Sequence, residues 1–141
     1  MKLHFSHLLI LIFLIFISFS NSQGQNLTQQ WKDGLSGSRL TALSGSIHSS
    51  NSSLTVLEFC PNGRYRYYKE GSWNVPGTAG GASNSTITGY WDIVQGNGYT
   101  YLTYRTDSGD QGSFPIYLTA NWKVNIGGTL FSVEQRAASC F

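Results

Sequence analysis

Beyond residue 53, apolar and polar residues alternate in short segments that are separated by glycine-containing turns. This period of two indicates β-strands, each of which buries one face. A helical spacing occurs near the start, where Leu27, Trp31 and Leu35 recur every four residues and predict a short helix over residues 26–35. About eight strands are predicted, over residues 39–47, 54–59, 64–69, 88–94, 99–105, 113–119, 122–126 and 129–135.

The predicted strands follow one another through tight turns, which is the pattern of an antiparallel meander. A meander of about eight strands removes its two open edges by closing into a small up-and-down barrel. A two-sheet sandwich is the alternative. The predicted fold class is therefore all-β, with a short helix before the barrel. A barrel of this size is either filled by its own side chains or hollow enough for one small ligand.

The first residues have the pattern of a secretory signal peptide. Lys2 precedes an apolar run over residues 8–19 that is too short to span a bilayer, and small or polar residues follow it. We predict cleavage after Ser22, or alternatively after Gly24, and a single barrel domain over residues 26–141. An uncleaved membrane anchor is the competing interpretation. The expected location is secreted or periplasmic.

The chain has two cysteines, Cys60 and Cys140, and both lie in the predicted mature part. Because export leads to an oxidising compartment, we predict that they form a disulfide. Two free thiols are the alternative. A bridge would tie the end of the chain to its middle.

A predicted hairpin turn over residues 60–63 leads into a strand that mixes arginine with tyrosine. Alternation places Arg64, Arg66 and Tyr68 on one face, and Tyr65, Tyr67 and Lys69 on the other. The first face could recognise anions or stack on sugars. The simpler interpretation is that the arginines lie in water and the tyrosines of the second face pack inward. The glycine- and serine-rich residues 71–85 are predicted to form a long loop, as are residues 44–53.

The sequence offers little for catalysis. The predicted mature chain has one histidine, His48, in a serine-rich segment, and no cysteine or histidine cluster has metal-ligand spacing. The residues Asp107-Ser-Gly109 match the core of an aspartic protease motif, and a hydrolase built on Asp107 would need a second chain to supply the partner carboxylate. A polar hairpin turn explains them better. We predict a protein that is not an enzyme and that holds no metal or other cofactor.

Charged residues make up 11 % of the chain and the formal net charge is +2. Such a chain lacks the basic surface that binds nucleic acid, and no membrane contact is expected after signal cleavage. Three glycosylation sequons, at Asn26, Asn51 and Asn84, are each predicted in a loop or terminus.

Several local patterns resemble those of a family of small exported bacterial β-barrel proteins. The similarity covers about Leu35 to Cys140 and rests on a Cys-Pro-Asn/Asp-Gly-Arg-aromatic motif over residues 60–65, Gly-Tyr-Trp over 89–91, Leu-Thr-Tyr over 102–104 and the closing strand. More loosely, this arrangement is similar to the calycin group of lipocalins and avidin-like barrels. That resemblance implies a barrel that binds small apolar molecules or, in one bacterial branch, inhibits proteases. Lipocalins carry Gly-x-Trp on their first strand, whereas it lies mid-chain here, so no binding residue is transferred.

These observations predict a non-enzymatic, monomeric barrel that binds a small apolar or amphipathic ligand or presents its loops to an extracellular protein. A secreted protease inhibitor or surface-interaction protein, acting through loops on a filled barrel, is the alternative. If the barrel is hollow, the candidate ligand-binding residues are its predicted inward side chains, namely Tyr65, Tyr67, Trp91, Ile93, Leu102, Tyr104, Phe114 and Ile116.

Overall fold

The computed structural model describes residues 25–45, 52–75 and 79–140, and their side chains except those of residues 72–82. The predicted signal peptide, His48 and Asn51 lie outside the described residues. Within that part of the chain, no helix is long and apolar enough to cross a membrane.

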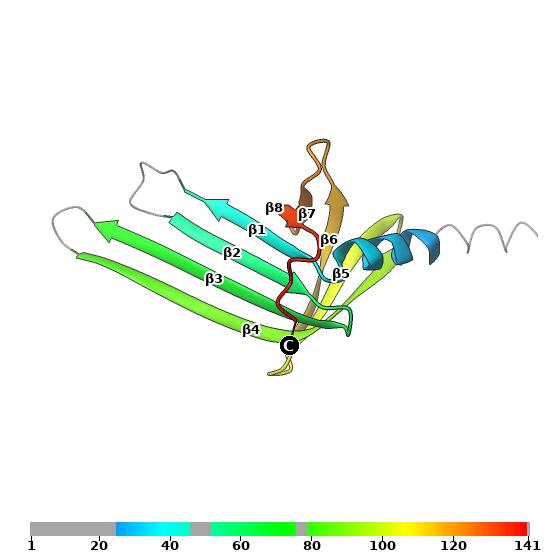
Figure 1. Ribbon diagram of the computed structural model, residues 1–141, viewed down its shortest axis with the longest axis horizontal. Helices are drawn as coiled ribbons and strands as arrows, with labels where there is room; N and C mark the ends of the chain where they lie inside the picture. The colour runs from blue at the N-terminus through cyan, green and yellow to red at the C-terminus, as the bar shows by residue number, and fades with distance from the viewer. Residues whose placement is uncertain (1–24, 46–51, 76–78, 141) are drawn as a thin grey trace, which may run out of the picture.

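Eight antiparallel strands form a closed barrel in which each strand pairs with its neighbours in sequence and β8 pairs with β1 (Figure 1). This confirms the predicted all-β meander. The strands are β1 (Arg39–Ser44), β2 (Ser52–Phe59), β3 (Arg64–Val75), β4 (Ala79–Gly96), β5 (Tyr99–Thr106), β6 (Gln111–Leu118), β7 (Val124–Ile126) and β8 (Thr129–Glu134).

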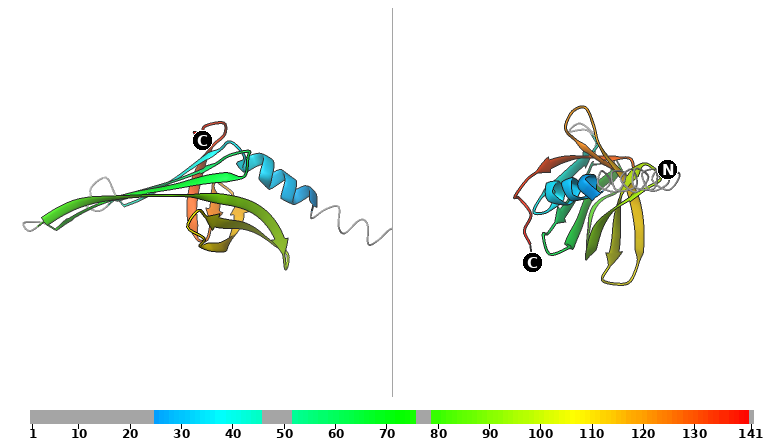
Figure 2. Two further views of the ribbon diagram at one scale, coloured as in Figure 1. Left: turned by 90° about the horizontal axis from the view of Figure 1, so that it is seen from below. Right: turned by 90° about the vertical axis from the view of Figure 1, so that its right-hand side faces the viewer.

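The strands differ greatly in length, which makes the barrel lopsided. β3 and β4 have 12 and 18 residues, whereas β7 has three. Strands β1 to β4 therefore continue as a sheet to one side of the barrel (Figures 1 and 2). β4 pairs with β5 only from Gly89 onward, so its first part is paired on one side, with β3.

The prediction of a loop over residues 71–85 was wrong. Gly71 pairs with Ser83 and Val75 with Ala79, so almost the whole segment is a continuation of the β3–β4 hairpin. The glycine- and serine-rich composition suggested a loop, but main-chain hydrogen bonds can hold small residues in a paired strand. For the same reason Asn84 lies in β4 and not in a loop. Asn26 lies in the helix that begins the described chain.

A helix over residues 25–35 lies across one end of the barrel, on the side opposite the sheet extension (Figure 2, right). Its last residue, Leu35, is 2 % exposed and belongs to the hydrophobic core, and Trp31 packs against the same core. An ion pair of 2.8 Å joins Lys32 to Asp92 on β4. The helix thus fills one end of the barrel with apolar side chains.

The end of the chain crosses the outside of the barrel as a strap over residues 136–140. Ala138 donates a backbone hydrogen bond to the Gly37 carbonyl, and Ser139 N–H donates to Glu58, a carboxylate only 3 % exposed. Cys140 forms the predicted disulfide with Cys60, with the two Cα atoms 5.5 Å apart. The disulfide therefore fixes the strap against the fully buried Cys60.

The predicted start of the strand over residues 122–126 was also wrong. The strand predicted from Trp122 begins at Val124, and Trp122 lies in the preceding turn with a φ of 58° and 79 % of its surface exposed. The hydrogen bond from Trp122 N–H to the Thr119 carbonyl closes that turn. An alternating pattern alone could not separate this turn from the short strand that follows.

Candidate functional site

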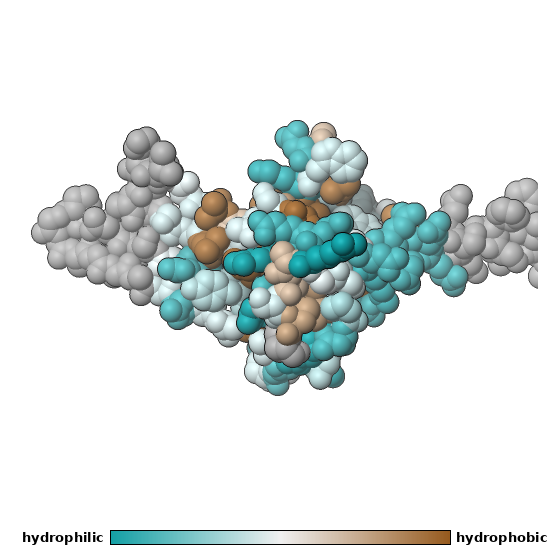
Figure 3. All heavy atoms as spheres, in the orientation of Figure 1, coloured by the Kyte–Doolittle hydropathy of each residue, from teal (hydrophilic) through white to brown (hydrophobic). Residues whose placement is uncertain are grey.

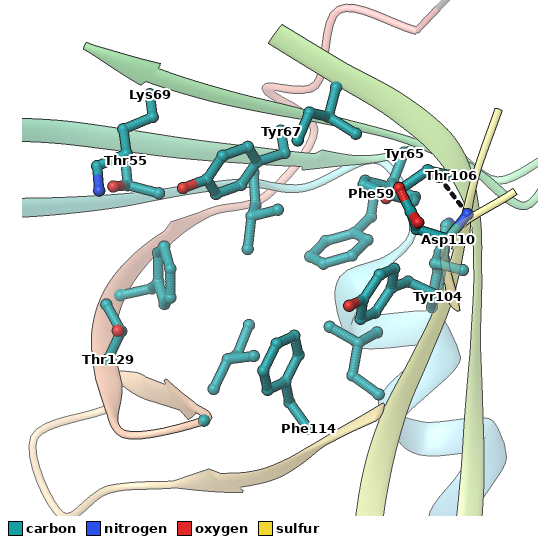
Figure 4. A pocket seen from close by; sticks show the side chains of 17 residues that line it. Thr55, Phe59, Tyr65, Tyr67, Lys69, Tyr104, Thr106, Asp110, Phe114 and Thr129 are labelled. Carbon is teal, nitrogen blue, oxygen red and sulfur yellow. Dashed lines mark hydrogen bonds between the residues drawn. The ribbon is translucent and has the colours of Figure 1, made fainter. Parts of the chain in front are cut away.

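The barrel interior holds an open cavity of about 650 Å³ (Figure 4). Its wall is formed by inward side chains of every strand from β2 to β8. The lining residues are Thr55, Leu57, Phe59, Tyr65, Tyr67, Lys69, Ile87, Trp91, Leu102, Tyr104, Thr106, Asp110, Phe114, Ile126, Gly127, Thr129 and Phe131.

Strand alternation explains which residues reach the cavity. On β3, Tyr65, Tyr67 and Lys69 point inward, as the sequence predicted, while Arg64 and Arg66 lie outside. The antiparallel register then sets Phe59 opposite Tyr65 and Leu57 opposite Tyr67. Neighbouring strands therefore present a continuous apolar and aromatic inner surface.

The aromatic rings of this wall contact one another in two groups. Phe59 and Trp91 meet edge to face with centroids 5.0 Å apart, and the Trp91 indole N–H donates to the Cys60 carbonyl. Tyr104 stacks on Phe114 at 5.6 Å and meets Tyr65 edge to face at 6.4 Å. Such contacts fix the rings in place, so the wall is ordered before any ligand enters.

Three glycines make room for these rings. A Cβ on Gly89 would lie 2.8 Å from the Tyr65 ring, and a Cβ on Gly112 would lie 2.8 Å from the Tyr104 hydroxyl. At Gly127 a Cβ would lie 2.7 Å from the Phe114 ring. Because these rings pack directly against glycine backbone, they lie close to the barrel wall and leave the centre of the barrel open.

Polar side chains lie at both ends of the cavity, while the Tyr104 hydroxyl and Thr129 lie elsewhere on its wall. Figure 4 shows Lys69 and Thr55 at one end, with the Tyr67 hydroxyl pointing toward them, and Asp110 and Thr106 at the other. Thr106 accepts a hydrogen bond of 2.9 Å from the Asp110 backbone N–H. Burial is the main reason that the pKa of Tyr65 is raised, and Tyr104 adds to it, so the Tyr65 phenol stays protonated at neutral pH.

Six of the eight predicted ligand-binding residues line this cavity, namely Tyr65, Tyr67, Trp91, Leu102, Tyr104 and Phe114. Ile93 and Ile116 do not line it; they pack in the hydrophobic core, where they are 2 % and 4 % exposed. They point inward as predicted, but the cavity does not reach them. Sequence reasoning missed the lining residues of β2 and β8, although their alternation could have indicated them.

Asp107, the residue of the protease-like motif, does not line the cavity. Its carboxylate accepts two hydrogen bonds from Arg64, of 2.6 and 2.7 Å, and one from Thr88. The hydrogen bonds from Arg64, followed by that from Thr88, lower the pKa of Asp107 to about 2. A carboxylate held ionised in this way clamps β3 and β4 to the β5–β6 turn, and it does not suit the proton sharing of an aspartic protease pair.

The second arginine of β3 also has a structural contact. Arg66 Nε donates a hydrogen bond of 2.7 Å to Glu58 on β2, and its Nη2 contacts the same oxygen. Arg64 in turn lies over the Tyr90 ring, 4.5 Å from its centroid. Arg64 and Arg66, on the outer face of β3, therefore make contacts that stabilise the outer surface of the barrel.

Within the described ranges, no three histidine, cysteine, aspartate or glutamate side chains come together as metal ligands. Comparison with protein-family models, curated proteins and solved structures finds no match to this chain. The resemblance to exported bacterial barrels therefore stays a prediction, and function is argued from the chain's own residues.

Proposed function

We propose that this protein is a secreted, non-enzymatic barrel that binds one small apolar or amphipathic molecule in its interior. The observation that carries the proposal is the cavity of about 650 Å³. Eight-stranded barrels can be filled entirely by their own side chains, whereas this one leaves an open cavity beside its hydrophobic core. A hollow, ordered and largely apolar interior is the usual form of a small-molecule site.

The lining supports an apolar body for the ligand. Seven aromatic side chains, five of which contact one another in two groups, surround the cavity together with leucine and isoleucine residues. Removal of apolar ligand surface from water would supply most of the binding free energy. Because the wall is fixed by ring contacts, little of that free energy would be spent on ordering the protein.

Secretion is supported by two features. The first is the apolar run near the start of the chain, which has the form of a signal peptide. The second is the Cys60–Cys140 disulfide, a bond that persists in oxidising compartments.

The proposal is tested by titrating the protein with N-phenyl-1-naphthylamine, a neutral fluorophore whose emission rises in apolar surroundings. Thr129 and Ser132 lie on β8, and only Thr129 lines the cavity. A T129W substitution should fill part of the cavity and abolish the fluorescence increase. The matched S132W substitution adds the same side chain to an exposed position outside the cavity and should leave it unchanged.

The proposal fails if the wild-type protein gives no fluorescence increase, or if T129W and S132W bind the probe equally. The second result would place the probe on the outer surface. Circular dichroism of both variants confirms that each retains the barrel.

A second candidate function, contact with another protein, is favoured by one surface feature. Leu43 is 79 % exposed and pairs with Leu54 on the outer face of β1 and β2, where apolar atoms gather in Figure 3. An L43K variant should no longer bind a partner that covers this patch. Crosslinking in the protein's own secretion medium tests this, and equal crosslinking of wild type and L43K would contradict it.

A further inference from the structure

The cavity contains a lysine whose charge has no carboxylate partner. Lys69 lines the cavity, and in the described ranges it takes part in no ion pair. The seven acidic residues of the chain all lie in those ranges. The nearest in sequence, Glu70, lies on the opposite face of β3 and accepts a hydrogen bond from Tyr68.

The surroundings of Lys69 add hydrogen-bond donors and no negative charge. Thr55 pairs with Lys69 across β2 and β3, and Ser85 pairs with it on β4. Figure 4 shows the Lys69 side chain, the Thr55 hydroxyl and the Tyr67 hydroxyl at the same end of the cavity. An ammonium group beside two hydroxyls can donate several hydrogen bonds to one anion.

Among the described residues, one carboxylate lines the cavity wall, and it lies away from this group. Asp110 lies at the other end of the cavity, in the β5–β6 turn, where its carboxylate accepts a hydrogen bond from Ser108. An anion near Lys69 would therefore meet no like charge at close range. The stacked rings of Phe114 and Tyr104 also line the cavity and suit an uncharged body.

We propose that the ligand is an anionic amphiphile, whose carboxylate or similar head group binds Lys69, Thr55 and Tyr67 while its apolar body fills the aromatic cavity. This inference rests on the proposed function and specifies its ligand class. The head group would lie at the end of the cavity nearer the sheet extension, because Lys69 is exposed there and Ile87 beside it is 42 % exposed. The apolar body would point toward the helix-filled end.

The test compares three probes that have alkyl chains of nearly equal length and differ in head group: decanoate, decanol and decyltrimethylammonium. Each is titrated against the protein in competition with N-phenyl-1-naphthylamine. We expect decanoate to bind about tenfold more tightly than decanol, because a hydrogen bond to a charged group contributes enough binding free energy for about a tenfold change in affinity. The cationic probe should bind more weakly than decanol.

Two matched variants separate the head-group contact from net charge. K69Q should remove the preference for decanoate over decanol and leave decanol binding unchanged. K123Q removes the same charge from an exposed turn outside the cavity and should keep the preference. A K69R variant should restore most of it.

Each outcome decides the inference. If decanol binds as well as decanoate, or if K69Q keeps the preference, the ligand class is wrong while the cavity still binds apolar molecules and the proposed function stands. If the fluorophore does not bind to the protein and none of the three probes binds to it either, both proposals fail. Sedimentation with anionic phospholipid vesicles distinguishes the source of the amphiphile: the barrel should remain in solution, and Lys69-dependent sedimentation would instead indicate a membrane lipid.

Discussion

Removal of the Cys60–Cys140 disulfide should lower the stability of the barrel by an amount that follows from its place in the chain. The two cysteines are separated by 80 residues. In the chain-entropy relation, closing a loop of that length removes about 15 cal/mol/K from the unfolded chain, or about 4.5 kcal/mol at about 25 °C. For a domain of this size, such a loss lowers the Tm by about 15 °C or more.

The C140A variant isolates the crosslink. Cys140 is exposed, so its side chain contributes little packing, and the Cys60 thiol that remains is fully buried. The strap keeps its hydrogen bonds from Ala138 to Gly37 and from Ser139 to Glu58. C60A should cost more than C140A, because it also removes a buried side chain.

Urea unfolding followed by tryptophan fluorescence measures both variants. The m-value of C140A should rise, because an unfolded chain without the crosslink exposes more surface. A loss of less than about 1 kcal/mol in C140A, or equal losses in the two variants, would refute the reasoning. The first result would mean that the crosslink does not restrict the unfolded chain, and the second that Cys60 adds no packing.

Two further substitutions test the wall and the clamp of the barrel. G89A should destabilise the protein by about 3 kcal/mol or more, because the new Cβ would lie 2.1 Å from the Arg105 carbonyl oxygen and 2.8 Å from the Tyr65 ring; thermal unfolding measures it. D107N should lower stability above about pH 4 and match wild type near pH 2. The folded-state pKa of Asp107 is lowered from 3.8 to about 2, so the stabilising contact of the wild-type carboxylate with Arg64 is lost as pH falls.

Each substitution has a control in the same element. G96A, also on β4, meets its nearest neighbour at 3.8 Å and should change stability by less than about 1 kcal/mol. Equal effects of G89A and G96A would mean that Gly89 has room for a side chain. D110N, in the same turn as Asp107, removes a carboxylate that forms no ion pair within the described residues and should cost less stability at neutral pH than D107N. A constant difference between D107N and wild type across this pH range would refute the ion-pair assignment.

The fold was largely predictable because its signal is local. Alternation along β2, β3 and β5 predicted these strands and the face of each that points inward. The inward orientation of Lys69 followed from that of Tyr65 and Tyr67. The turn chemistry of residues 60–63 gave the first hairpin. Closure into a barrel followed because a meander of this length otherwise leaves two open edges.

The errors lie where main-chain pairing or long-range packing decides the structure. Residues 71–85 have the composition of a loop, yet the ladder with β3 extends them as a strand. Ile93 and Ile116 point inward, but alternation does not distinguish an inward residue that packs in the core from one that lines the cavity. The extent of the cavity depends on strand register and on rings that rest on Gly112 and Gly127, which no local pattern specifies.

Native mass spectrometry without reductant tests the central claim most directly, on the protein purified from the secretion medium of its own host. The account predicts an added mass that is released on denaturation and that belongs to an apolar or amphipathic molecule, with an acidic group if Lys69 binds its head. The protein itself should be two hydrogens lighter than its reduced formula because of the disulfide. A bare protein mass, together with no binding of N-phenyl-1-naphthylamine, would contradict the claim that this barrel is a ligand carrier.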